Sequence, residues 1–380
     1  MRMSEQVSRT LSDVPSHILA VSIINLDNIA KNYAIIKKEL PNKTQIMAIL
    51  KADAYGFGAA RIGGRLYREG CKAFFVATIE EGIDLRKSLP EGAQIYILSG
   101  LLKGGEDLLT QYALVPVLNN PYQSNLWIDH AKKLNKKLDA VVHVDTGISR
   151  NGYSYRNMEE DLCDIKGYLN IILVMSHLAC ADIPDHPLNV IQLGRFRNVL
   201  QYFGNFKGCL AATEGIFLGK EYFFDAVRPG KALYGFSVRR DKIGSMIPVM
   251  DVFTRIVQIN NLKFGDSIGY DATFTADRSM TTITVGMGYA DGFMRKFSGF
   301  GYGFLGGKKI PMVGRISMDY MVFDATEVEE FHLKIGNWVA LTADPYYTLE
   351  KWALELSTLP HEIACRFGSR VKRVYLQEEA

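Results

Sequence analysis

The segment TQIMAILKADAYGFGAARI, residues 44–62, contains both parts of a repeating strand-and-helix unit. Its first half is a short apolar run typical of a buried strand, and its second half has apolar residues at helical spacing. Lys51 lies between them, beside small residues and the glycines Gly56 and Gly58. A lysine that ends a strand often marks only the point where the chain reaches water. Next to such a turn, it is also suited to form a Schiff base beside a phosphate.

The same rhythm recurs through the first part of the chain. We predict eight strands, at residues 45–51, 73–78, 94–100, 114–118, 140–147, 171–178, 208–213 and 226–235. Predicted helices cover residues 22–40 (with Asn25 or Asp27 as N-cap), 58–70, 120–135, 157–169 and 189–204. Eight such units in roughly 200 residues predict an α/β fold of the TIM type, a (β/α)8 barrel with its site at the C-terminal strand ends. A doubly wound sheet is the alternative, but no G-x-G-x-x-G motif follows a strand.

The pattern changes after about residue 240. Short alternating runs separated by glycines follow, at residues 246–259, 281–289, 308–325 and 337–343. This pattern is typical of an antiparallel β domain. We therefore predict a barrel domain over residues 1–240 and a second, C-terminal, mainly antiparallel β domain over residues 241–380.

Composition excludes several classes of function. The chain has 380 residues, a formal net charge of +3, 48% hydrophobic and 22% charged residues, and acidic and basic residues mix along it. This balance gives no electrostatic footprint for nucleic acid or a membrane surface. No apolar run reaches membrane-spanning length, the N-terminus lacks a secretory pattern, and five scattered cysteines form no C-x-x-C. We expect a cytoplasmic protein without nucleic-acid or membrane partners and, because His177, Asp182 and His186 lack a ligand spacing, without a metal.

Polar side chains cluster just after the predicted strand ends. They belong to Lys51, Tyr55, Arg150, His177, Thr213 and Arg228, and Gly230 follows Arg228 in the same segment. In a barrel they meet at one mouth, where an ammonium and two guanidinium groups repel one another unless an anion binds. A phosphorylated aldehyde suits this mouth, because its aldehyde reacts with the lysine and its phosphate accepts hydrogen bonds from N–H and hydroxyl groups.

Four motifs here resemble those of one family, the fold-type III alanine racemases that depend on pyridoxal phosphate. They are AILKADAYGFGA with Lys51, VDTGISRNGY with Arg150, VMSHLACAD with His177 and AVRPGKALYG with Arg228. The resemblance implies that pyridoxal 5′-phosphate is the cofactor and that Lys51 holds it as a Schiff base. The cofactor-binding residues that it implies are Lys51, Tyr55, Arg150, His177, Thr213, Arg228, Gly230 and Lys231.

The C-terminal part resembles the same family. GDSIGYDATFTA carries Tyr270, VGMGYADGFMR carries Tyr289, VGRISMDYMVFDA carries Met318 and Asp319, and HEIACRFGSRVKRVY resembles the closing signature. The resemblance implies that Tyr270 is the second catalytic residue. It also implies that Tyr289 and Met318 contact the substrate, that Asp319 supports them, and that all come from the partner in a homodimer with shared sites.

The activity implied by the resemblance is interconversion of L-alanine and D-alanine, which would supply D-alanine for peptidoglycan. Racemisation removes the α-proton of the cofactor-bound substrate (an external aldimine) from one face and returns one to the other, so two bases are needed. The family assigns them to Lys51 and Tyr270, with Arg150 at the substrate carboxylate. A tyrosine with the ordinary pKa of about 10 is a poor base near neutral pH. The family lowers it through a hydrogen-bonded line to His177 and Arg228.

Several residues depart from the family pattern. Asp53 and Phe57 replace the usual Asn and His, and Ser369 replaces a tyrosine that contacts the phosphate in some members. His143 stands where many members carry a lysine, carbamylated in some, that positions the arginine. We expect Arg150 to be held instead by His143 or by an anion.

Other functions compatible with the sequence remain open. A racemase of broader amino-acid range needs only a few changes in the wall contributed by the partner. A carrier that binds the cofactor without catalysis would belong to another class, but such carriers lack the long β domain. A decarboxylase of the same architecture would need a C-terminal cysteine motif that this chain lacks.

Overall fold

The computed structural model describes residues 5–156, 165–204, 206–237, 245–342 and 347–376. Its contacts divide the chain into two compact units, one of Asn28–Ile247 and one of Met1–Asp27 with Pro248–Ala380. This division differs from the predicted domains at the N-terminus, because the first 27 residues group with the C-terminal unit. The predicted boundary after residue 240 lies outside the described residues.

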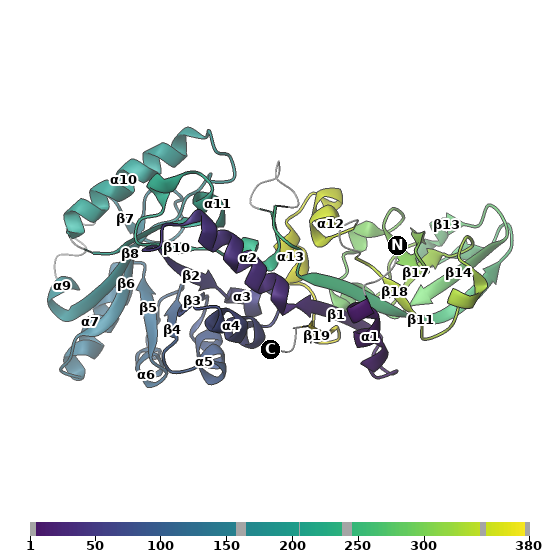
Figure 1. Cartoon of the computed structure of the whole chain (residues 1–380), viewed down its shortest axis with the longest axis horizontal. Helices are drawn as coiled ribbons and strands as arrows, with labels where there is room; N and C mark the ends of the chain where they lie inside the picture. The colour runs from purple at the N-terminus through teal and green to yellow at the C-terminus, as the bar shows by residue number, and fades with distance from the viewer. Residues whose placement is uncertain (1–4, 157–164, 205, 238–244, 343–346, 377–380) are drawn as a thin grey trace. The chain divides into compact units, whose positions relative to one another are not determined.

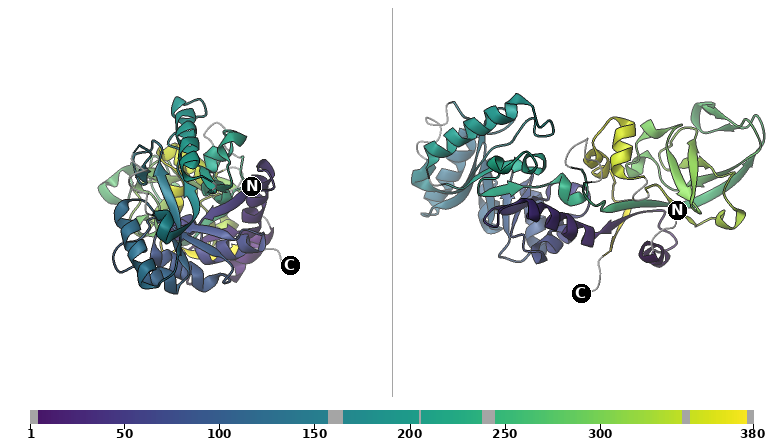
Figure 2. Two further views of the ribbon diagram at one scale, coloured as in Figure 1. Left: turned by 90° about the vertical axis from the view of Figure 1, so that its left-hand side faces the viewer. Right: turned by 45° about the horizontal axis from the view of Figure 1, so that its top comes forward.

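The unit Asn28–Ile247 contains a closed parallel barrel (Figures 1 and 2). Its strands are β2 (Gln45–Ile49), β3 (Ala73–Val76), β4 (Gln94–Ile97), β5 (Leu114–Leu118), β6 (Leu138–Asp145), β8 (Leu169–Met175), β9 (Gly208–Ala212) and β10 (Ala226–Arg228). Each pairs in parallel with its neighbours, and pairing of β10 with β2 closes the ring. The short β7 (Tyr153–Ser154) is added beside β6. All eight predicted strands are present, and the predicted barrel is confirmed.

Helices lie outside the ring of strands (Figure 2). They are α2 (Leu26–Glu39), α4 (Ala59–Arg68), α5 (Ile79–Ser88), α6 (Glu106–Gln111), α7 (Pro121–Lys133), α9 (Ile165–Tyr168) and α10 (Pro187–Phe203), with short turns α3 (Lys51–Tyr55), α11 (Thr213–Ile216), η1 (Lys220–Tyr222) and η2 (Lys231–Tyr234). Most of the helix predicted at 157–169 lies outside the described residues. Caps fix several starts: Asn120 accepts a hydrogen bond from Gln123 N at α7, and Asn25 accepts one from Asp27 N at α2.

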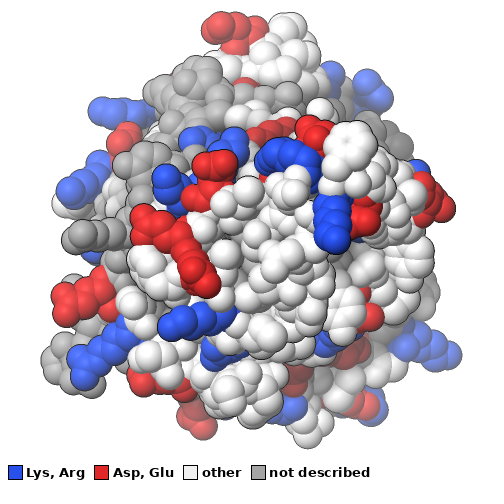
Figure 3. Space-filling model, turned by 90° about the vertical axis from the view of Figure 1, so that its right-hand side faces the viewer, with Lys and Arg blue, Asp and Glu red and all other residues white. Residues whose placement is uncertain are grey.

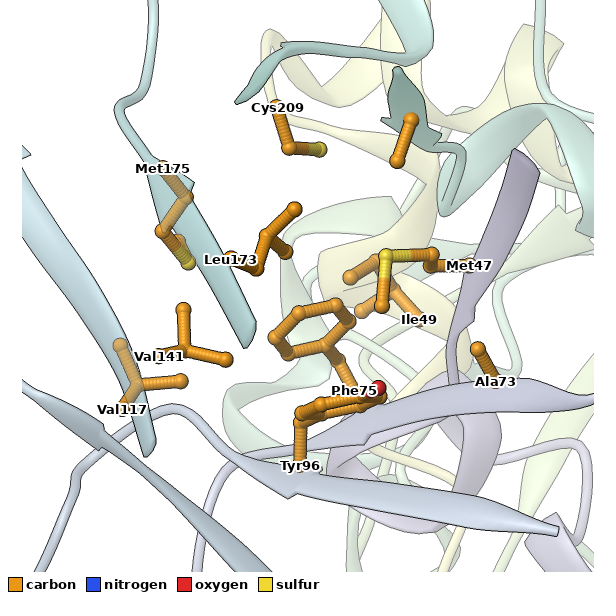
Figure 4. Packing of buried hydrophobic residues seen from close by; sticks show 11 residues of the cluster. Met47, Ile49, Ala73, Phe75, Tyr96, Val117, Val141, Leu173, Met175 and Cys209 are labelled. Atoms are coloured by element: carbon orange, nitrogen blue, oxygen red, sulfur yellow. The ribbon is translucent and has the colours of Figure 1, made fainter. Parts of the chain in front are cut away.

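Alternate residues of the barrel strands point inward and fill its centre. Figure 4 shows Phe75 of β3 and Tyr96 of β4 among aliphatic side chains from the other strands. Their rings stack with centroids 4.8 Å apart. The barrel is therefore a packed core and not a pore, and it fixes the strand ends from which the loops start.

The second unit is built on an eight-stranded sheet. The sheet contains β1 (Ala20–Asn25), β11 (Met250–Leu262), β14 (Met280–Val285), β15 (Tyr302–Leu305), β16 (Lys308–Val313), β17 (Met321–Asp324), β18 (Trp338–Ala340) and β19 (Lys372–Leu376). Six of these strands form an antiparallel ring closed by β11 and β14. The pair β12 (Ser267–Ile268) and β13 (Phe274–Thr275) lies apart from it, and the helices include α1 (Glu5–Asp13), α12 (Leu349–Leu356) and α13 (Pro360–Ala364). The predicted antiparallel domain is confirmed.

The predicted helix over 22–40 is wrong in its first four residues. Residues 20–25 form β1, which pairs antiparallel with β11 and parallel with β19. Val21, Ile23 and Ile24 are β-branched and buried there, which favours a strand covered on both faces. The helix α2 begins at Leu26.

Candidate active site

Lys51 follows β2 by two residues and begins a left-handed turn, so the predicted strand extends two residues too far. Ala52, Asp53, Ala54 and Tyr55 all have positive φ, between 51° and 56°. Left-handed backbone costs L-residues about 1–2 kcal/mol each, so four in succession cost about 4–8 kcal/mol. Such strain persists only where surrounding contacts hold it, and it concentrates at functional sites. This conformation distinguishes the loop that bears Lys51 from an ordinary strand end.

Arg228, at the end of β10, carries a buried positive charge. Its guanidinium donates hydrogen bonds to Ser176 O (2.6 Å), Cys209 O (3.0 Å) and Cys209 Sγ (3.0 Å). Its residue is 2% exposed, and among the described residues no carboxylate forms an ion pair with it. Because a buried guanidinium has five N–H donors, this arrangement suits an additional acceptor in the barrel mouth.

Thr213 and Gly230 form a compact cradle beside Tyr55. The buried Thr213 hydroxyl accepts a hydrogen bond from Gly230 N at 3.0 Å. A Cβ on Gly230 would lie 2.6 Å from the Tyr55 hydroxyl, so only glycine allows the backbone and that hydroxyl to approach so closely. A hydroxyl and a phenol at one point are donor types that a phosphate group accepts from.

His177 follows β8 in the same mouth. Burial and the positive charges of Arg228 and Arg150 lower its pKa to about 3, and Lys51 contributes in the same direction. His177 is thus within electrostatic reach of the lysine and of both arginines. The predicted hydrogen bond between His177 and Arg228 is not among the contacts of the described residues, because Arg228 donates to Ser176 O instead. The imidazole is therefore neutral beside the guanidinium.

His143 does not hold Arg150 by a hydrogen bond in this structure. Its ring Nδ1 lies 2.8 Å from Asn119 Oδ1. The Asn119 amide nitrogen donates to the carbonyls of Leu98 and Val117, so its oxygen accepts and His143 Nδ1 is the donor. Nε2 is buried with no hydrogen-bond partner, and burial and Arg228 lower the pKa to about 3. A neutral acceptor thus takes the place of the family lysine.

Other buried groups that the motifs did not reveal organise the mouth. Gln192 of α10 accepts a hydrogen bond from Ala179 N and donates to His177 O and Thr146 Oγ1, so it ties the loop of His177 to the loop that leads to Arg150. Glu214 pairs with Lys231 at 2.5 Å, so the side chain of this predicted cofactor residue contacts a carboxylate. A lone Gln or Glu within a helix gives no sequence signal for such a role.

The remaining predicted residues lie in the second unit; Tyr270, Tyr289 and Met318 are exposed, and Asp319 is partly buried. Tyr270 is 68% exposed, in the turn η4 (Tyr270–Ala272) between β12 and β13. Met318 is 52% and Tyr289 43% exposed. The neighbour of Tyr270, Asp271, forms an ion pair with Arg315. The turn is therefore anchored while the phenol remains accessible.

Arg370 connects the segments of Tyr289 and Met318. It pairs with the buried Asp291 at 2.9 Å and with Asp319 at 2.8 Å. The backbones also join, because Tyr289 N donates to Ser317 O at 3.1 Å. A Cβ on Gly288 would lie 2.4 Å from Met318 O. Tyr289, Met318 and Asp319 thus form one rigid group within this unit.

A pocket of about 660 Å³ in this unit brings Tyr270 and Tyr289 together. Arg295, Lys296 and Arg366 also line it. Arg366 pairs with Glu362 at 3.0 Å and Lys296 Nζ donates to Leu356 O at 2.6 Å, so the pocket combines two phenols with cationic side chains that already contact other groups.

Comparison with protein families decides the relationship. The family model described as the N-terminal domain of alanine racemase matches residues 24–238, and the one described as its C-terminal domain matches residues 249–375. The chain belongs to the alanine racemase family. The resemblance found in the sequence motifs is confirmed.

Individual racemases resemble the chain along nearly its whole length. The alanine racemase of Rhodospirillum rubrum is 38% identical over 358 residues, which are 94% of this chain and 96% of that protein. That of Brucella abortus is 36% identical over 368 residues, 93% and 92% of the two chains. The solved alanine racemase of Bartonella henselae, described with covalently bound pyridoxal phosphate, has a TM-score of 0.88 at 35% identity and covers 94% of this chain and 99% of its own. That of Streptomyces coelicolor has a TM-score of 0.88 at 28% identity, with 96% and 99% covered.

The described part of the chain shows neither a membrane-spanning helix nor a metal-binding cluster. Within the described ranges, no helix combines the length and hydropathy that crossing a bilayer requires. The same residues contain no group of three or more His, Cys, Asp or Glu side chains placed to bind a metal. On the face drawn in Figure 3, acidic and basic side chains are interspersed, and neither sign forms a continuous patch.

Proposed function

We propose that this protein is an alanine racemase that interconverts L-alanine and D-alanine with pyridoxal 5′-phosphate. Membership of the family supports the activity. The observation that carries it at the level of residues is the barrel mouth, where Lys51 lies with Arg150, His177 and the buried Arg228. When bound, pyridoxal phosphate supplies an aldehyde that links to amino groups with loss of water, and a ring that draws electrons from the substrate α-carbon.

The residues of the mouth fit this cofactor. Thr213 and Tyr55 offer hydroxyl donors to the phosphate, and Gly230 allows the backbone to approach them closely. Arg228 offers N–H donors to the ring nitrogen, and its permanent charge opposes protonation there. Lys51 Nζ is the site of covalent attachment. The side-chain ammonium of Lys231 contacts Glu214, so only the backbone of this residue is left to contact the phosphate.

Two groups move the proton in this proposal. Lys51 Nζ takes or returns the α-proton on the D side, and Tyr270 Oη does so on the L side. Both are needed, because the proton leaves one face and a proton arrives at the other. The exposed phenol of Tyr270 supports this role, since it is available to a substrate. Arg150 would hold the substrate carboxylate, and Tyr289 and Met318 would contact the substrate.

We propose that the site is shared in a homodimer, with Tyr270, Tyr289, Met318 and Asp319 coming from the partner protomer. The exposure of three of them in the isolated chain supports this arrangement. Burying such apolar and aromatic groups at an interface would also exclude water from the reaction.

Supply of D-alanine for peptidoglycan in the cytoplasm is the biological role that we propose. A racemase of broader range is the second candidate. Tyr320, which stands where glutamine is frequent in the family, is 48% exposed beside Met318, and it would alter the substrate wall.

Proton NMR of L-alanine in deuterated water tests the proposal. The purified protein with added pyridoxal phosphate should remove the α-proton signal, and chiral analysis should find D-alanine. An unchanged α-proton signal with the cofactor bound would contradict the proposed activity on alanine. The same assay with L-serine and L-lysine would then distinguish the broader racemase.

A further inference from the structure

The left-handed turn after Lys51 needs contacts that hold it in place. Within the turn, Ala54 N donates to Leu50 O at 2.8 Å and Gly58 N to Asp53 O at 2.9 Å. The Asp53 carboxylate accepts from Ala59 N at 2.7 Å. These bonds fix the shape of the turn. Leu50 N, just before Lys51, donates to Phe75 O of the neighbouring strand β3 at 2.8 Å, but none of these bonds holds the residues after Lys51 against β3.

Glu81 supplies that connection. Its Oε1 accepts a hydrogen bond from Ala52 N at 2.7 Å, and its Oε2 accepts one from Ala77 N at 2.7 Å. Ala52 directly follows Lys51, and Ala77 directly follows β3. One carboxylate therefore bridges the carboxyl ends of two adjacent barrel strands, and it accepts a charge-assisted hydrogen bond from each side.

Helix capping alone does not account for this carboxylate. Glu81 is in the first turn of α5, where Thr78 Oγ1 accepts from Glu81 N at 3.3 Å. A glutamate in a capping box bonds back to its own N-terminus, as Oε2 does approximately here. Oε1 instead accepts from Ala52 N, 29 positions earlier, and this bond plays no part in capping α5. Capping explains one oxygen of the carboxylate and leaves the other.

We propose that Glu81 is a positioning residue for Lys51. By accepting from Ala52 N it holds the strained turn against β3, and it thereby fixes the point from which the lysine side chain enters the mouth. The importance of that point for catalysis rests on the proposed function. The effect on the backbone does not.

Three variants separate positioning from capping and from charge. Glu81→Gln removes the charge and places an NH2 group against one of the two N–H donors, so one bond is lost and the other loses its charge assistance; the bond to Ala52 N is weakened in either orientation. Glu80→Gln removes the same charge from the exposed neighbouring residue. Thr78→Ala removes the cap of α5 and leaves the Ala52 bond. Thermal unfolding of each variant checks that it folds.

The first measurement is hydrogen–deuterium exchange of the peptide that contains Ala52, on protein stripped of cofactor. Loss of a hydrogen bond to a charged acceptor should speed exchange in Glu81→Gln at least about tenfold. Glu80→Gln and Thr78→Ala should exchange there like the wild type. Equal exchange in wild type and Glu81→Gln would overturn the proposal whatever the enzyme does.

The second measurement is capture of pyridoxal phosphate, followed by the visible absorbance of the lysine-bound cofactor. Glu81→Gln should need at least about tenfold more cofactor for half-saturation, while both controls match the wild type. Equal capture by Glu81→Gln would overturn the proposed effect of the turn on Lys51. Weak capture by Thr78→Ala would contradict the proposal in another way, because it would mean that Glu81 acts only by capping α5. Absence of capture by the wild type would contradict the proposed function itself.

Discussion

The barrel mouth and the face that bears Tyr270 are built in opposite ways. The mouth is cationic around a buried guanidinium, and its main chain is strained: Arg228 is 2% exposed, Lys51 and Arg150 are exposed, and four residues after Lys51 are left-handed. The Tyr270 face is open, with the phenol 68% exposed and Met318 52% exposed. A buried cation and a strained backbone carry an unfavourable free energy that a bound partner can offset. Exposed aromatic side chains are typical of a surface that another molecule covers. The difference teaches that neither region is complete alone, and it motivates our proposal of a shared site.

Removing Lys51 should break the mouth most completely. Lys51→Ala loses both the attachment point and one base, so we expect racemisation to fall by at least about 10⁴-fold. The visible absorbance of lysine-bound cofactor should vanish in the same sample. Lys43→Ala, at an exposed position before β2, is the control and should keep both properties. Full activity without Lys51 would refute its role.

Removing the phenol tests the other region. Tyr270→Phe should keep the cofactor absorbance, because the mouth is intact, and lower kcat by about 10²–10⁴-fold. Loss of the α-proton to deuterated solvent should remain faster from D-alanine than from L-alanine, since only Lys51 is left. Tyr122→Phe changes another exposed phenol, on α7 (53% exposed), and should have no effect. Equal loss in both directions would argue against assigning the L side to Tyr270.

Acid should weaken the mouth through His143. Its pKa is about 3 in the folded chain, against an ordinary value of 6.5, so protons bind first to the unfolded chain. Above pH 6.5 the imidazole is neutral in both states, so the free energy of unfolding is not reduced. As the pH falls from 6.5 toward 3, only the unfolded chain takes up the proton, and the free energy of unfolding decreases. Between pH 7 and pH 5 this loss is about 2 kcal/mol.

Urea unfolding at the two pH values checks this effect. His143→Asn should lose about 2 kcal/mol less than the wild type between them. His17→Asn, at an exposed position, should behave as the wild type does. An identical pH dependence in His143→Asn would mean that the histidine is not held neutral.

The smallest effect is expected in the rigid group of the Tyr270 face. Arg370→Met removes the cation between Asp291 and Asp319, so the segments of Tyr289 and Met318 should loosen. We expect KM for alanine to rise about 3–10-fold with little change in kcat, and Arg370→Lys to recover part of it. Arg278→Met also breaks pairs with two carboxylates in this unit and should leave KM unchanged. A fall in kcat alone would contradict a role in substrate binding.

The sequence predicted the barrel because β-branched runs, helical spacing and short turns agree at each repeat. It also predicted that Lys51, Arg150, His177 and Arg228 meet, because in a parallel barrel all strand ends share one face. The strand β1 was missed because its apolar residues continue into the pattern of α2, and only the distant partners β11 and β19 decide between helix and strand.

Contacts between distant side chains could not be read from the sequence. The left-handed turn contains ordinary alanines, and nothing in their spacing predicts positive φ. Asn119, Gln192 and Glu81 act through hydrogen bonds to residues 24 to 46 positions away. The motif Thr78-x-x-Glu81 did carry a capping signal, but not its second bond across to Ala52.

The most direct test of the shared site combines two inactive variants. Lys51→Ala and Tyr270→Phe chains with different tags are co-expressed, and the mixed dimer is purified through both tags. If each site takes Lys51 from one protomer and Tyr270 from its partner, the mixed dimer has one intact site of two and should show about half of the wild-type activity. If both residues act within one chain, neither site is intact and the mixed dimer should stay as inactive as its parents, which would contradict the account.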